Sequence, residues 1–270
     1  MQSGLSLPYN PSNRILTNDD LSKILGKYIP INDINIFRNA FVHRSYCTRK
    51  NENYINGNVK CPKDCLPLQE ESNERLEFLG DAVLNLIIGK YLYERFPDEN
   101  EGFLTKMRTK LVNGSMLAHL ASILNLSSYI IVSKQVEDSN GRNNKNIMED
   151  CFEALLGAML LDSNMNILPV YDWLTTFIEE NVDFSELITS NTNFKDIVIK
   201  HFQHSNGWIP KFFSEDVQTR KNVKVFFVNM KDPEGKLLAK GQGNTKKQAE
   251  NDCSRNALIT LGINPTKTVD

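Results

Sequence analysis

Three acidic residues stand at helical spacing inside an apolar stretch, residues 73–96 (NERLEFLGDAVLNLIIGKYLYERF). Glu74, Glu77 and Asp81 occupy positions i, i+3 and i+7, so a helix would place them on one narrow stripe. Apolar residues fill nearly every other side, which predicts a helix buried nearly all round and ended by Pro97. Because buried carboxylates need a neutralising partner, the stripe indicates a cation site.

A second apolar segment, residues 146–161, carries Asp150 and Glu153 on one face, with Glu149 beside them. Packing of the two predicted helices side by side would bring four carboxylates together. The expected metal ligands are therefore Glu77, Asp81, Asp150 and Glu153. Oxygen ligands without His or Cys favour Mg²⁺, with Mn²⁺ as a substitute. Such ions activate a bound water as a nucleophile that can attack a phosphodiester. The spacing alone leaves open that these acids simply face solvent.

The elements that must position these acids are helical, and we find no convincing strand before Phe184. We expect an all-α domain over residues 17–184, with a polar inserted loop at 47–72. The expected helices are two short ones within 17–46, then 73–96, one around 104–111, one from Gly114 to about Leu124, 146–161 and 167–181, with a loop at 133–146.

After residue 190 the pattern changes to an α+β module, expected over residues 192–263. The expected order is α-β-β-β-α, with a helix at 192–204, strands at 211–218, 223–230 and 236–241, a turn at 232–235 and a helix at 244–261. From residue 190 onward there are 13 basic and 8 acidic residues, against 18 basic and 25 acidic before it. This asymmetry predicts an anionic partner for the module.

The composition of the 270 residues is that of an ordinary globular chain, with 40% hydrophobic residues and a net charge of −2. We expect a cytoplasmic protein (host cytoplasm if the source is a virus), because no membrane span or signal-peptide core is present. Five cysteines fit a reducing compartment. Nothing resembles a glycine-rich nucleotide loop, so no nucleotide cofactor is expected. A zinc site is permitted by the spacing of His43, Cys47, Cys61 and Cys65, but we do not favour it.

The motif NERLEFLGD resembles the signature of the ribonuclease III family. DENEGFLTKMRTKLV, MEDCFEALLGAMLLD and AFVHRSY are similar to other family segments, so the resemblance covers about 17–183. It implies metal binding by the four acids named above, with Glu74 and Glu101 supporting the site and the substrate. The catalytic residues implied by the resemblance are Glu74, Glu77, Asp81, Glu101, Asp150 and Glu153.

The resemblance further implies a homodimer built on the signature helices, with double-stranded RNA lying across both cleavage centres. Phe78 is the candidate for insertion into the partner subunit. The expected activity is divalent-metal-dependent cleavage of double-stranded RNA to 5′-phosphate and 3′-hydroxyl products with short 3′ overhangs. The alternatives are a non-catalytic protein that binds and sequesters duplex RNA, and a nuclease-fold scaffold within a larger ribonucleoprotein.

The α-β-β-β-α module resembles a double-stranded-RNA-binding domain, most closely in GQGNTKKQAENDCSRNALITL. Two departures are that Asn222 stands where the family has a His and Ile199 where it has a Gln. We therefore expect recognition by shape and charge that weakens steeply with salt. The expected RNA contacts are Lys195, Arg220, Lys221, Asn222, Lys246 and Lys247.

Overall fold

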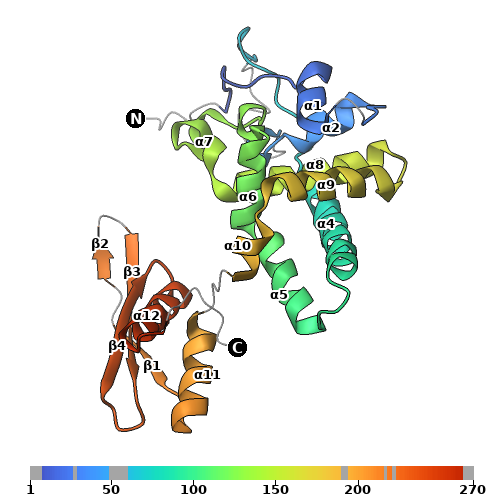
Figure 1. The fold of residues 1–270 in the computed structure, drawn as a ribbon. Coiled ribbons are helices and arrows are strands. Elements are labelled where there is room, and N and C mark those ends of the chain that lie inside the picture. Colours follow the sequence, from blue (N-terminus) through green and yellow to red (C-terminus); the bar gives the residue numbers. More distant parts are fainter. Residues whose placement is uncertain are drawn as a thin grey trace, which may run out of the picture. The chain divides into compact units, whose positions relative to one another are not determined.

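The computed structural model describes residues 8–26, 29–48, 60–189, 194–215, 218–220 and 223–263. The chain divides into two compact units, residues 1–182 and 183–270 (Figure 1). We call them the helical domain and the α+β module. Within the described ranges, no helix is both long and apolar enough to cross a membrane.

The helical domain consists of short and long helices, as predicted. Its elements are α1 (Asn18–Leu25), α2 (Ile34–Ala40), η1 (Arg44–Tyr46), α4 (Glu74–Arg95), α5 (Glu101–Leu111), α6 (Gly114–Ile123), η2 (Leu126–Ser128), α7 (Lys134–Asp138), η3 (Gly141–Asn143), α8 (Lys145–Asp162) and α9 (Ile167–Asn181). The segment 133–146, expected to be a loop, contains α7 and η3 because Ser133 caps a short helix by accepting from the Val136 N–H.

The helix at the centre of this domain is α8, not α4. Every residue of α8 from Ala154 to Leu160 is buried. The expectation that α4 is buried nearly all round is wrong for the single chain, because Phe78, Leu86 and Tyr93 are 82, 61 and 72% exposed. Their spacing puts them on one side of α4, opposite the side that packs on the domain.

Two glycines allow α4 and α8 to cross in close contact. A Cβ atom on Gly80 would lie 1.7 Å from the carbonyl oxygen of Glu153, and one on Gly157 would lie 2.3 Å from that of Leu76. Any larger side chain at either glycine would force the backbones apart. The crossing therefore fixes how the two helices face each other.

The α+β module begins with α10 (Phe184–Thr189) and has helix, antiparallel sheet and helix in the predicted order. Its elements are α11 (Phe194–Asn206), β1 (Lys211–Ser214), β2 (Gln218–Arg220), β3 (Val223–Lys231), β4 (Leu237–Gly243) and α12 (Lys246–Thr260). The expected strand 211–218 is instead split: β1 pairs with the end of β3 and β2 with its start, while β4 pairs along the other edge of β3.

Helices α11 and α12 cover one face of the sheet (Figure 1). The core between them is made of Val198, Phe202, Val228, Met230, Ala249, Cys253, Ala257 and Leu258. On β4, Gly241 permits close packing, since a Cβ there would lie 2.1 Å from the backbone nitrogen of Cys253. The middle of α12 is thereby held against the sheet.

Candidate active site and RNA-binding surface

The α4–α8 crossing gathers the carboxylates expected to hold metal. On α4, Glu77 lies one helical turn before Gly80 and Asp81 directly follows it, while Asp150 and Glu153 lie on the facing turns of α8. The charges of Asp81, Glu77 and Asp150 all act on Glu153, which places the four acids in one cluster. We call these four residues the acid cluster.

Burial and repulsion from neighbouring acids disfavour the charged forms of Glu77, Asp150 and Glu153. Burial is the largest cause that raises the pKa of Glu153, to about 8, and the neighbouring carboxylates of Asp81, Glu149, Glu77 and Asp150 raise it further. Burial, followed by repulsion from other acids, also raises the pKa of Glu77. The pKa of Asp150 is raised mainly by burial. A group of acids that repel one another in this way is an electrostatic site for a cation.

The chemistry of this donor set fits a hard divalent cation, because it consists of carboxylate oxygens alone. As the side chains lie, however, no three His, Cys, Asp or Glu residues among the described part of the chain stand close enough to hold an ion. Asp81 instead accepts a hydrogen bond from the Asn85 amide at 2.8 Å.

The two supporting acids lie in different surroundings. Glu74 begins α4, accepts from Ser72 Oγ at 3.0 Å and is ion-paired with Arg44 at 3.3 Å. Its charge raises the pKa of Glu77, so it lies beside the acid cluster. Glu101 begins α5, is exposed and accepts from Thr105 at 2.8 Å. It is not among the charges that act on Glu77 or Glu153.

The basic residues of the module fall into two kinds. Lys246 and Lys247 are the first residues of α12 and are exposed, beside backbone N–H groups that favour anions. Lys195 is instead ion-paired with Glu250 at 2.8 Å and lies 4.8 Å from the Phe212 ring centroid. Its charge is thus already compensated within the module.

The remaining expected RNA contacts lie in the segment between β2 and β3. Arg220 ends β2, where its backbone pairs with Val223. Lys221 and Asn222 lie outside the described residues.

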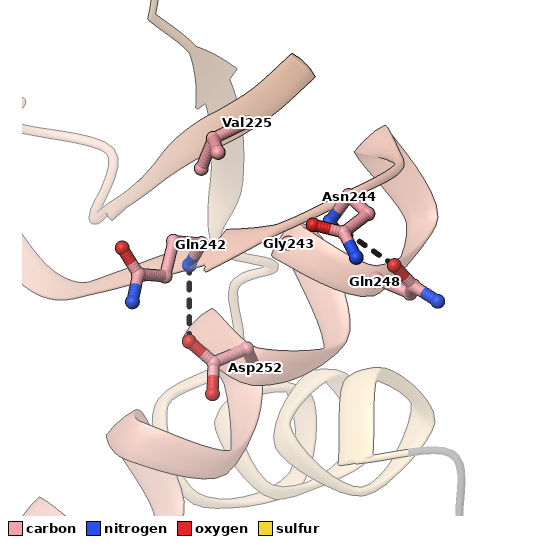
Figure 2. A pocket seen from close by; sticks show the side chains of 6 residues that line it. All are labelled: Val225, Gln242, Gly243, Asn244, Gln248 and Asp252. Atoms are coloured by element: carbon pink, nitrogen blue, oxygen red, sulfur yellow. Dashed lines mark hydrogen bonds between the residues drawn. The ribbon is translucent and has the colours of Figure 1, made fainter. Parts of the chain in front are cut away.

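A polar pocket of about 510 Å³ lies beside the start of α12 (Figure 2). Its lining consists of Val225, Gln242, Gly243, Asn244, Gln248 and Asp252. Two hydrogen bonds brace its walls: the Gln242 N–H donates to Asp252 at 3.0 Å and the Asn244 N–H donates to Gln248 Oε1 at 3.1 Å. These bonds hold the turn that presents Lys246 and Lys247.

Comparison with known proteins gives a family model for each unit. Residues 33–168 match the model "Ribonuclease-III-like" and residues 194–261 match "Double-stranded RNA binding motif". The chain is 34% identical to "Ribonuclease 3" of Streptococcus gordonii, over 84% of this chain and 89% of that protein. The chain belongs to the ribonuclease III family. It is accordingly an endoribonuclease, with double-stranded RNA as the partner of its second unit.

Other proteins similar to this ribonuclease III chain come from viruses and from bacteria. "Probable ribonuclease 3" of Acanthamoeba polyphaga mimivirus is 34% identical over 92% of this chain, which spans 46% of the length of that protein. "Putative protein A464R" of Paramecium bursaria Chlorella virus 1 is 31% identical over 95% of this chain. The solved nuclease domain of ribonuclease III from Campylobacter jejuni is 32% identical over 61% of this chain and 98% of that domain, with a TM-score of 0.49.

The sequence-based list of site residues leaves out two charged groups next to the acid cluster. Glu149 acts on the pKa of both Glu77 and Glu153, and its carboxylate packs against Gly114, where a Cβ would lie 2.1 Å from Oε2. Arg44 lies beside Glu74. Glu149 is visible in the acidic pattern of α8, whereas 30 residues separate Arg44 from Glu74 and no spacing links them.

The zinc site that the spacing permits is not formed in the described part of the chain. His43 Nδ1 is engaged with Ser45 at 2.8 Å, and the Cys61 thiol donates to the carbonyl of Leu66 at 3.3 Å. No group of three possible metal ligands occurs among the described residues. Cys61 and Cys65 are not joined in a disulfide in the described part of the structure.

Proposed function

We propose that this ribonuclease III uses Mg²⁺, or Mn²⁺ in its place, to hydrolyse double-stranded RNA to 5′-phosphate and 3′-hydroxyl products with short 3′ overhangs. The observation that carries the proposal is the acid cluster, formed where α4 and α8 cross at Gly80 and Gly157. Four carboxylates gathered at one helix crossing repel one another, which gives them a physical reason to bind a divalent cation.

In this mechanism, the residues that would hold the ion are Glu77, Asp81, Asp150 and Glu153. A divalent cation bound there supplies a Lewis acid and an activated water for attack on the phosphodiester. Glu153, with its raised pKa, must lose its proton to become a ligand, so binding improves as pH rises. The exposed lysines of α12 hold the phosphate backbone of the duplex.

We also propose that the enzyme is a homodimer joined through the exposed side of α4. Phe78, Leu86 and Tyr93 form an apolar stripe on the helix that carries Glu77 and Asp81. A self-complementary contact along α4 would bury this stripe and bring two acid clusters near one duplex. Phe78→Glu should yield a monomer in sedimentation velocity. Ile123→Glu, at an exposed apolar position on α6, should leave the dimer intact, and a dimeric Phe78→Glu would contradict this interface.

The test of catalysis is a long duplex RNA incubated with and without Mg²⁺, with the products sized and their ends analysed. Asp81→Asn and Glu153→Gln should abolish cleavage while retaining duplex binding. Asp172→Asn, which removes an exposed carboxylate from α9, is the charge-matched control and should cut like the parent. Cleavage at the parent rate by both active-site variants would rule out the metal assignment. Binding without any cleavage by the parent would favour the sequestering alternative.

A further inference from the structure

A single arginine stands at the edge of the acid cluster. The Arg44 guanidinium contacts Glu74 through Nη1 at 3.3 Å, and its side chain is 70% exposed. Its positive charge lowers the pKa of Asp150 and of Glu77 against the stronger effect of burial. These effects place Arg44 near the acids of both α4 and α8.

The segment that carries Arg44 is firmly anchored. Val42, two residues before Arg44, and Tyr46, at the end of η1, are buried, with exposed fractions of 2% and 0%. The neighbouring Ser45 Oγ accepts from the Ser133 N–H at 3.0 Å, and the His43 N–H donates to the Ile131 carbonyl at 3.0 Å. The Arg44 side chain is thus exposed to solvent while its backbone is fixed by hydrogen bonds, which favours a role in binding.

Only part of the donor capacity of Arg44 is used. A guanidinium offers five N–H donors in a planar fork. Among the described residues, Glu74 is the one side chain that the Arg44 guanidinium contacts. The free donors match the two oxygens of a phosphodiester, which guanidinium groups bind in a bidentate manner.

We propose that Arg44 is a phosphate-binding residue of the cleavage centre, held by Glu74 so that its guanidinium contacts the RNA backbone next to the acid cluster. This placement would offset the repulsion between the carboxylates and an incoming phosphate. The inference rests on the proposed function, because it takes duplex RNA to be the substrate bound at this cluster.

Duplex binding tests the contact without cleavage, in protein that carries Asp81→Asn in every arm. Adding Arg44→Ala should weaken binding about ten-fold or more, the loss of one charge-assisted contact. The slope of log affinity against log salt should become shallower by about one. Arg44→Lys should restore the slope but only part of the affinity, because Lys lacks the fork. Lys134→Ala, at an exposed ion pair on α7, is the control and should change neither.

Metal binding separates this role from a structural one. Mn²⁺ binding measured by calorimetry should be unchanged or tighter in Arg44→Ala, because a cation that opposes the metal is removed. Weakened Mn²⁺ binding, or unchanged affinity and salt slope for RNA, would overturn the proposal. If the parent fails to cut duplex RNA with Mg²⁺, the proposed function fails, while the salt slope still decides whether Arg44 contacts phosphate.

Discussion

Glu153→Gln should make the metal-free enzyme more stable while it abolishes cleavage. The carboxyl of Glu153 is only partly buried, yet burial and the acids around it raise its pKa from 4.5 to about 8. Between these two values the folded state binds more protons than the unfolded state. Protonated Glu153 therefore makes its full contribution to the stability of the folded state below about pH 4.5, and this contribution is lost as pH rises toward 8.

The size of this effect follows from the shift in pKa. At about 1.36 kcal/mol per pKa unit, the ceiling is about 5 kcal/mol. Solvent screening and relaxation of a partly exposed site reduce this to about 2 kcal/mol. For a domain of this size, that corresponds to a rise in Tm of about 4–8 °C for the Gln variant at pH 8.5.

The assay is thermal unfolding in a chelator at pH 5 and pH 8.5, for the parent, Glu153→Gln and the surface control Glu180→Gln. The parent and the control should lose stability as pH rises, whereas Glu153→Gln should lose much less. Added Mg²⁺ should reverse the order, because it binds the folded parent and stabilises it by mass action. Equal losses in the parent and Glu153→Gln would refute the argument that repulsion in the acid cluster destabilises the metal-free fold.

Two further predictions concern the helix crossing and the RNA surface. Gly157→Ala should destabilise the protein by about 1–3 kcal/mol and reduce cleavage, because the added Cβ would collide with the Leu76 carbonyl. Urea unfolding checks this: the midpoint should fall while the m-value stays that of the parent. An unchanged midpoint would contradict the close crossing. Lys246→Ala combined with Lys247→Ala should weaken binding of all duplexes about equally and reduce the slope of log affinity against log salt by about two. The control Lys236→Ala should change neither the affinity nor the slope. A loss of affinity for only some RNA sequences would argue against backbone contacts.

Local patterns in the sequence were enough to predict the long helices and to single out the acids on α4 and α8. Helical geometry alone places Glu74, Glu77 and Asp81 on one stripe. It likewise places Asp150 and Glu153 on one face. The order of the module's elements follows from its turn residues and β-branched segments in the same way. The break between β1 and β2 escaped prediction, because strand pairing along β3, and not composition, decides where each short strand ends.

The tertiary structure decided what the spacing of residues along the chain does not encode. Gly80 and Gly157 are 77 positions apart, so only the folded chain shows that they form one close crossing and bring the acid cluster together. Only the folded chain likewise shows the ion pairs of Arg44 with Glu74 and of Lys195 with Glu250. Such a pair determines how much of the charge of the arginine or lysine remains available to a ligand. Short-range periodicity determined which residues share a helix face, and packing determined which faces meet.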